Sequence, residues 1–478
     1  MKARAVASES LAHVQVIAPA GLGTTAVAAL RARGIDARIA NEARGAARND
    51  DLTVDPGTDD VVAWALDAPP GAAATVELAQ LCSRAAAAGR PICLLAPQPK
   101  GSGRAAVERA AALAFLRAHG AALAHDVDAW LEAVVALVRF GMPRGPHAAI
   151  VAPAGSWLEA QALALVAEAE ALGIRAPKLE AAGTDAVLYD PALGPPPDAP
   201  PSQPLAIPVI ARPELGGDAP ALYGARAALA AVDVLGHAAE RIEVGLGPAP
   251  ASASAELDIK RDMLERNLAK LIAGSRIGDH ETKLLLSSYG VPVTRQIVAT
   301  TPSAAVNGAR RVGYPVELKP WGPDAATEPG GCPVERGISS DAMVRRGYAA
   351  VLAAAGRPGE GAVIVRETPP LGRDLQVAFH KLPHLGWTVV LDAPGAPHIA
   401  AAPAPLRLLD AQRLAAAVVA SRAGDPEPDR AGLANLLRRA SHLVIDLGDR
   451  LAKLELPRVI VGGRGARSVV ADAWCELT

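Results

Sequence analysis

The sequence predicts an α/β protein with two tandem parallel-sheet domains followed by a different C-terminal region. The first observation is a repeated phrase, Val-Ile-Ala-Pro-Ala-Gly at residues 16–21 and Ile-Val-Ala-Pro-Ala-Gly at residues 150–155. Each copy leads into a helical pattern that closes on a Gly-Ile pair, at residues 34–35 and 173–174. A buried strand, a tight turn and a helix start form the half-unit of a doubly wound domain. The second observation is that strands alternate with helices of 10–15 residues, which is typical of a parallel sheet.

The first segment, residues 11–145, contains four predicted strands and four predicted helices. Apolar runs predict strands at residues 13–18, 37–40, 61–66 and 91–96. Helical periodicity predicts helices at residues 24–33, 73–88, 105–119 and 127–138. We expect right-handed crossovers that place these helices against a single parallel sheet.

The second segment, residues 146–244, restarts the same plan. Its later strands are expected at residues 186–189 and 207–211, on either side of a proline-rich loop. The stretch 245–256, rich in Gly, Ala, Pro and Ser, predicts a linker. The third segment, residues 257–478, begins with a helix-rich lead and then a capped helix that exits through Gly290-Val291-Pro292.

Composition excludes several classes of protein. The chain has 478 residues, 50% of them hydrophobic but only 3% aromatic, so its cores must consist of Ala, Val and Leu. Its net charge of −2 argues against a nucleic-acid or membrane-surface partner. No apolar run reaches the ~20 residues that span a bilayer. The four cysteines have neither CxxC spacing nor neighbouring histidine pairs, so we expect no zinc site or disulfides and a cytoplasmic location.

Several motifs of the third segment occur in one order: Ser288–Val293, Gly313–Lys319, Val363–Glu367, Leu454–Val461 and Val469–Ala473. Together they resemble the ATP-grasp domain of the NDP-forming (ADP-forming) acyl-CoA synthetases, relatives of succinyl-CoA synthetase. The resemblance implies that Val469–Ala473 is a terminal strand followed by an Asp-Ala helix. The first two segments resemble the paired flavodoxin-like domains of the same enzymes.

The resemblance implies ATP or ADP and Mg²⁺ as ligands of the third segment. Lys319 matches the family's lysine that contacts nucleotide phosphates, where a cation offsets phosphate charge. Glu367 matches the hinge residue that meets adenine and ribose. Gly330 and Gly331 match the phosphate loop, and Glu455 is the expected Mg²⁺ ligand.

The resemblance also implies partners. The CoA-binding domain that opens full-length members of the family is not among these residues. We therefore expect CoA or acyl-CoA as a ligand and a separate CoA-binding subunit as a partner chain.

Other positions depart from the family pattern. The loop that carries the family's phosphorylated histidine corresponds to residues 96–104, which contain no histidine. The phosphate loop at residues 323–331 has lost its two basic residues. Pro457 replaces an asparagine, and Leu382 replaces an acidic residue. Phosphoryl transfer depends on such groups, so the catalytic residues stay unassigned.

Three functions therefore remain open. The first is an acid–thiol ligase subunit that binds nucleotide and relies on a partner chain, which Lys319, Glu367 and Glu455 favour. The second is a non-catalytic scaffold or regulatory protein, which the missing histidine and Pro457 favour. The third is a divergent ATP-grasp ligase whose carboxylate substrate attacks ATP directly.

Overall fold

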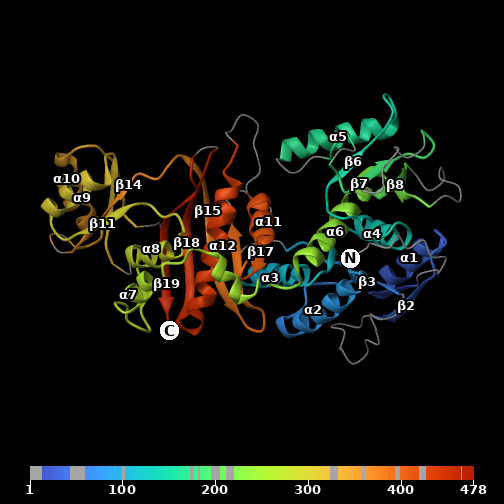
Figure 1. Cartoon of the computed structure of the whole chain (residues 1–478), viewed down its shortest axis with the longest axis horizontal. Helices are drawn as coiled ribbons and strands as arrows, with labels where there is room; N and C mark the ends of the chain where they lie inside the picture. Colours follow the sequence, from blue (N-terminus) through green and yellow to red (C-terminus); the bar gives the residue numbers. More distant parts are fainter. Residues whose placement is uncertain are drawn as a thin grey trace. The chain divides into compact units, whose positions relative to one another are not determined.

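A computed structural model of the chain describes residues 13–42, 60–99, 103–172, 177–180, 183–194, 205–211, 220–322, 332–357, 359, 361–392, 399–418, 427–463 and 466–478. The chain forms two compact units (Figure 1). The first comprises residues 1–99 and 108–247, and the second comprises residues 100–107 and 248–478. No helix in the described ranges combines the length and the hydrophobicity needed to cross a lipid bilayer.

A five-stranded parallel sheet opens the first unit. Its strand order is β2-β1-β3-β4-β5, the order of flavodoxin-like doubly wound sheets. The strands are β1 (Val14–Ala18), β2 (Ala37–Glu42), β3 (Val61–Ala65), β4 (Cys93–Leu95) and β5 (Ala122–Ala124). One face packs on α1 (Ala20–Arg31) and α4 (Val127–Arg139), and the other packs on α2 (Ala72–Ala87) and α3 (Arg104–Ala118).

A second parallel sheet follows, with the order β6-β7-β8-β9. Its strands are β6 (Ala148–Ile150), β7 (Ala186–Tyr189), β8 (Leu205–Ile210) and β9 (Leu222–Tyr223), with helices α5 (Trp157–Leu172) and α6 (Ala225–Val244). The predicted pair of parallel sheets is confirmed. The sequence analysis missed β5 and β9, because strands of three and two residues are too short to show a period.

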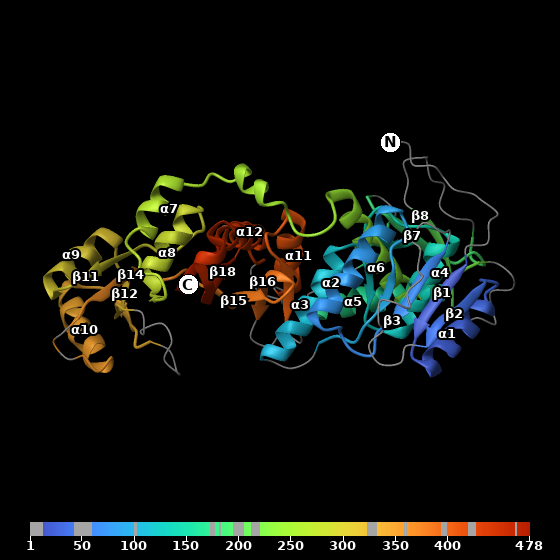
Figure 2. The same cartoon turned by 90° about the horizontal axis from the view of Figure 1, so that it is seen from below.

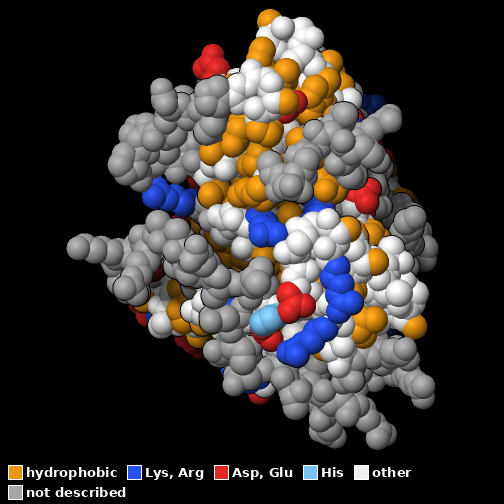
Figure 3. Space-filling model, turned by 90° about the vertical axis from the view of Figure 1, so that its right-hand side faces the viewer, with side chains coloured by type: hydrophobic (Ala, Val, Ile, Leu, Met, Phe, Trp, Pro, Cys, Tyr) orange, Lys and Arg blue, Asp and Glu red, His pale blue; other side chains and the backbone are white. Residues whose placement is uncertain are grey.

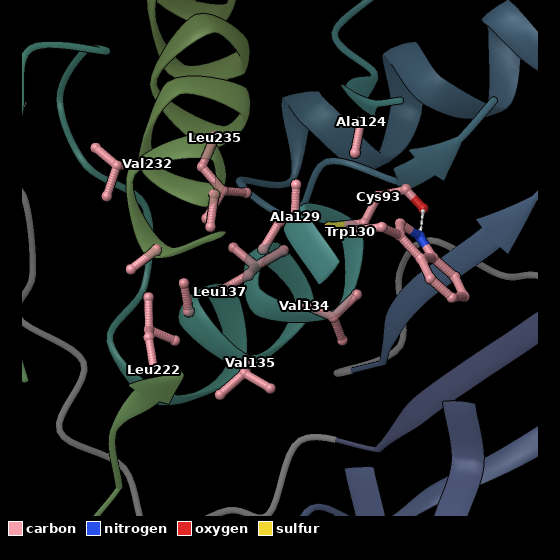
Figure 4. Close-up of a cluster of buried hydrophobic side chains, with 14 of the residues drawn as sticks. Cys93, Ala124, Ala129, Trp130, Val134, Val135, Leu137, Leu222, Val232 and Leu235 are labelled. Atoms are coloured by element: carbon pink, nitrogen blue, oxygen red, sulfur yellow. Dashed lines mark hydrogen bonds between the residues drawn. The ribbon is translucent and has the colours of Figure 1, made fainter. Parts of the chain in front are cut away.

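Helices α4 and α6 join the two parallel sheets into one apolar core (Figure 4). Trp130 of α4 is fully buried, and its indole Nε1–H donates to the Cys93 carbonyl oxygen at 2.9 Å. Beside it, Arg33 pairs with Glu132 at 2.6 Å and stacks on the Tyr223 ring at 3.4 Å. Small residues let the elements approach closely, as the low aromatic content predicts.

The second unit contains two antiparallel sheets (Figure 2). The four-stranded sheet has the order β11-β14-β12-β13, with β11 (Gln296–Ala299), β12 (Val316–Pro320), β13 (Glu335–Ile338) and β14 (Val363–Glu367). Helices α9 (Pro302–Val312) and α10 (Asp341–Ala354) cover one of its faces with apolar side chains.

The six-stranded sheet has the order β10-β19-β18-β15-β16-β17. It comprises β10 (Arg276–Ile277), β15 (Gly372–Leu382), β16 (Gly386–Asp392), β17 (Ala400–Pro403), β18 (Leu451–Gly462) and β19 (Val469–Leu477). Helices α11 (Leu408–Val418) and α12 (Arg430–Leu447) cover one face. Helix α7 (Arg261–Leu268) precedes β10, and helix α8 (Asp279–Ser288) follows it.

A strand, β19, lies where a terminal helix was expected. The expected helix after the strand at residue 469 is wrong, because residues 469–477 form the single strand β19, paired along its length with β18. Apolar residues alternate with Asp472 and Glu476 there, which suits a strand with one buried face. In the predicted linker, Ala251–Glu256 forms a 3-10 helix whose Ser254 is buried.

Hydrophobic side chains also reach the surface, as the face drawn in Figure 3 shows. Among the described residues of the first unit, the large exposed ones are Ile39, Val127, Leu163, Leu179, Leu193 and Val244. Exposed apolar residues are usual on folded proteins and do not by themselves indicate a binding surface.

Close helix packing at Gly236 yields a first prediction. A methyl group added at Gly236 of α6 would lie 2.3 Å from the backbone carbon and oxygen of Gly145. We expect Gly236→Ala to lower the free energy of unfolding of the first unit by about 1–3 kcal/mol, measured by urea unfolding. Gly23→Ala is the control, because its methyl group meets nothing nearer than 3.6 Å, and it should stabilise α1 by about 0.5–1 kcal/mol. Equal stability of the two variants would contradict the packing argument.

Candidate functional site

Strands β12 and β14 carry charged residues on the face of their sheet opposite helices α9 and α10. Val316 and Leu318 point toward the helices and belong to the apolar core. Because side chains alternate along a strand, Glu317 and Lys319 point to the other face. The antiparallel register sets Arg366 of β14 opposite Glu317, so all three charges share that face.

These charges meet partners from α8 and β19. The Nζ of Lys319 lies 2.7 Å from Oδ1 of Asp472 and 3.0 Å from Oδ2 of Asp279. An Nη of Arg366 lies 2.6 Å from the same Asp472 oxygen. Lys319 is 4% exposed and Arg366 is 1% exposed. One carboxylate oxygen is therefore held between two buried cations.

A further lysine and two backbone groups complete the arrangement. The Nζ of Lys283 lies 3.0 Å from Oδ2 of Asp279 and donates to the Ala471 carbonyl at 2.6 Å. Arg366 donates to the same carbonyl at 2.7 Å and to Glu317 at 2.7 Å. The Ala473 N–H donates to Oδ1 of Asp279 at 2.9 Å. We call this set the ion cluster, which comprises Asp279, Lys283, Glu317, Lys319, Arg366 and Asp472.

The ion cluster is balanced, with three cations and three carboxylates. Burial alone would raise the pKa of Asp472, but Lys319 and Arg366 outweigh it and hold this pKa far below its usual range. Burial alone would also raise the pKa of Asp279, but Lys283 and Lys319 outweigh it and lower this pKa. Burial lowers the pKa of Lys283 to about 7. The neighbouring cations thus keep Asp279 and Asp472 ionised.

The structure separates the side chains of Lys319 and Glu367. Glu367 is paired in register with Val316, so its side chain lies on the helix-covered side of the sheet. It accepts hydrogen bonds from the Arg295 backbone N–H at 3.0 Å and the Arg295 side chain at 2.6 Å, and pairs with Arg467 at 2.7 Å. Burial alone would raise the pKa of Glu367, but these bonds outweigh it and lower this pKa. Its expected contact with a nucleotide stays a prediction.

Glu455 lies on the face of the six-stranded sheet that also carries Asp472. It pairs in register with Trp474, two residues after Asp472, and forms an ion pair with Lys453 at 2.9 Å. Across the part of the chain that the structure describes, no three His, Cys, Asp or Glu side chains form a group that could hold a metal ion. These residues alone do not fit Mg²⁺, and the role of Glu455 as a metal ligand stays a prediction.

The remaining expected residues lie elsewhere. Gly330 and Gly331 fall outside the described residues. Part of the loop at residues 96–104 also falls outside them. These expectations stay predictions.

The sequence analysis singled out only one residue of the ion cluster, Lys319. Two signals were available for the others. Glu317 and Arg366 are charges inside otherwise apolar strands, which indicates a buried ionic contact. Asp279 and Lys283 stand at the i, i+4 spacing of a helical ion pair.

Comparison with known proteins identifies the second unit. Residues 273–477 match a family described as "ATP-grasp domain", so the C-terminal region of the chain is an ATP-grasp domain. The beta subunit of acetate–CoA ligase [ADP-forming] II from Pyrococcus furiosus is 25% identical over 209 residues, which cover 41% of this chain and 89% of that subunit. The predicted resemblance is confirmed for this region.

Solved structures show a partial likeness. One is the dinucleotide forming acetyl-coenzyme A synthetase 1 of Ca. Korarchaeum cryptofilum in complex with coenzyme A and Ca-AMPCP. Its sequence identity to this chain is 25%, and the match covers 46% of this chain and 100% of that chain with a TM-score of 0.40. Another is PH1788 from Pyrococcus horikoshii, with 22% identity, coverage of 46% of this chain and 97% of that chain, and a TM-score of 0.39.

Removal of one cation from the ion cluster should be costly. Lys319→Ala leaves Asp279 and Asp472 buried with fewer partners, and we expect it to lower the free energy of unfolding of the second unit by about 3–5 kcal/mol. Urea unfolding followed by circular dichroism measures the change. Lys381→Ala is the control, because its ion pair with Asp449 is exposed and should have no measurable effect. Similar stability of both variants would mean that the cluster does not support the fold.

The ion cluster also predicts a pH dependence. The folded-state pKa of Asp472 lies below the value of about 3.9 of an unfolded aspartate. The unfolded chain therefore takes up this proton first as the pH falls, and the free energy of unfolding decreases from about pH 5 downward. Asp472→Asn lacks this contribution, so its stability should change less between pH 7 and pH 3 in urea titrations. Parallel pH curves for the variant and the wild type would contradict the assignment.

Proposed function

We propose that this chain binds ATP or ADP through its ATP-grasp domain as a subunit of an acid–thiol ligase of the ADP-forming acyl-CoA synthetase type. The match of residues 273–477 and the similarity to a ligase beta subunit support the proposal. The proposed ligand is anionic, so cationic groups of this chain would bind it.

One observation carries the proposal: Lys319 and Arg366 converge on a single carboxylate oxygen, at 2.7 and 2.6 Å. A phosphate oxygen has the same requirements as that carboxylate, namely negative charge and two close cationic donors. The guanidinium is planar and the ammonium is a compact charge, a combination suited to phosphate. These two side chains are the groups that we expect to hold a nucleotide phosphate.

Catalysis would depend on a partner chain. The loop at residues 96–104 contains no histidine to carry a phosphoryl group, and a covalent relay needs a nucleophile within hydrogen-bond reach of its electrophile. We propose that a separate subunit supplies the CoA-binding domain and this nucleophile. The relative from Pyrococcus furiosus is itself named as a subunit.

The second candidate is a non-catalytic scaffold or regulatory protein on the same fold. The balance of the ion cluster favours it, because a site whose cations are fully paired offers no net positive charge to a triphosphate. The replacement of the family's asparagine by Pro457 also favours it. A measurement of nucleotide binding distinguishes a ligase subunit from a scaffold that binds no nucleotide.

Calorimetric titration of the purified chain with ATP and ADP, with and without Mg²⁺, tests the proposal. We expect binding that Lys319→Gln weakens at least tenfold, because the variant removes one of the two cations, and that Lys381→Ala leaves unchanged. Saturating nucleotide should also raise the stability of the wild type, by about 2.7 kcal/mol at a hundred times its Kd. Absence of binding at millimolar nucleotide would leave the scaffold as the better account.

A further inference from the structure

We propose that His442 of α12 is a pH-sensitive latch, which keeps the 3-10 helix η3 (Ala251–Glu256) packed on α12 near neutral pH and releases it on acidification. The first unit ends at residue 247, so η3 lies in the segment that opens the main part of the second unit. Release would free this segment while the two antiparallel sheets stay folded. Nucleotide binding plays no part in this device.

His442 is buried without a hydrogen-bond partner. Its exposed fraction is 0%, and among the described residues neither ring nitrogen has a partner. Most buried polar groups in folded proteins do have one, because they give up water when they are buried. An imidazolium ion is costlier still in such a place, since it carries a charge and two N–H donors. The folded protein therefore favours the uncharged imidazole.

His442 lies on the face of α12 that η3 contacts. Arg438 stands one turn earlier, and its guanidinium pairs with Glu256 of η3 at 2.7 Å. Asp446 stands one turn later and accepts a hydrogen bond at 2.6 Å from the hydroxyl of Tyr289, directly after α8. Because residues four apart share one face of a helix, His442 lies between these two contacts. Opening of η3 would therefore expose the imidazole to water.

The charges around His442 do not compensate for its burial. Burial lowers the pKa of His442, and Arg438 lowers it further. Asp446 and Glu256 offset only part of this effect, and both already have partners. The folded-state pKa thus lies below the value of about 6.5 of an exposed histidine. The open state takes up the proton first as the pH falls, so release of η3 becomes easier below about pH 6.5.

Helix η3 is held by few contacts. Of its six residues only Ser254 is buried. The side chain of Glu256 is 69% exposed, and an exposed ion pair contributes little to stability. The hydrogen bonds of a 3-10 helix also have poorer geometry than those of an α-helix. Opening of η3 should therefore cost much less free energy than unfolding of the whole unit, so that one protonation can shift it.

Hydrogen exchange followed by mass spectrometry tests the latch, with each rate divided by the intrinsic rate at the same pH. A histidine that titrates only in the open state makes opening about tenfold more frequent at pH 5.5 than at pH 7.5. We expect the protection of η3 in the wild type to fall by this factor, and that of α10 to stay constant. His442→Leu takes up no proton and should keep equal protection of η3 at both pH values.

His384→Asn is the matched control, because it removes an exposed histidine of the same unit. Its φ of 63° lies in the left-handed region, which asparagine tolerates. Protection of η3 in this variant should fall as in the wild type.

Constant protection of η3 in the wild type overturns the inference, and so does a fall that persists in His442→Leu. An equal fall in α10 indicates a general loss of stability and also overturns it. His442→Gln is a second variant that does not titrate in this range, in case His442→Leu does not fold. If neither folds, the comparison of η3 with α10 in the wild type decides between the same outcomes.

Discussion

The pairing of six charges, five of them buried, is the constraint on which the second unit depends. A charge taken out of water is costly unless a partner of opposite sign and further hydrogen bonds replace the lost hydration. Here Lys319 and Arg366 come from the four-stranded sheet, Asp472 comes from the six-stranded sheet, and Asp279 comes from α8. The two sheets and the helix must therefore keep one arrangement for the charges to stay compensated.

The first unit depends on a different constraint, which is close packing of small residues. With few aromatic side chains available, the core that joins its two parallel sheets relies on alanine, valine and leucine from α4 and α6. Trp130 is the large exception, and its indole N–H has a backbone partner in Cys93. Such a core tolerates little change in volume, and at Gly236 helix α6 lies close against the backbone of Gly145.

Local patterns predicted much of the fold. The strand at residues 186–189 was predicted with the bounds that the structure shows, because it is an apolar run between clear turn signals. Strand β9 has two residues and leaves no pattern to recognise. The site was harder, because Lys319 finds its partners in Asp279 and in Asp472, 153 residues away along the chain. No spacing rule brings such distant residues together. The opposite orientation of Lys319 and Glu367 follows from the register of β12 and β14, which only the structure shows.

The position of β19 in the chain bears on how the protein folds during synthesis. Asp472 is the last member of the ion cluster along the chain, and Ala471, whose carbonyl accepts from Lys283, lies 188 residues after that lysine. At ribosomal rates of 5–20 residues per second, about 10–40 s pass between the synthesis of Lys283 and that of its acceptor Ala471. Once Arg366 has been made, three cations face only two carboxylates, and strand β19, which lies between β10 and β18 in the six-stranded sheet, does not yet exist. The ATP-grasp unit therefore completes its fold only after almost all of its residues have been made. Until then, the charged side chains of the ion cluster must stay hydrated.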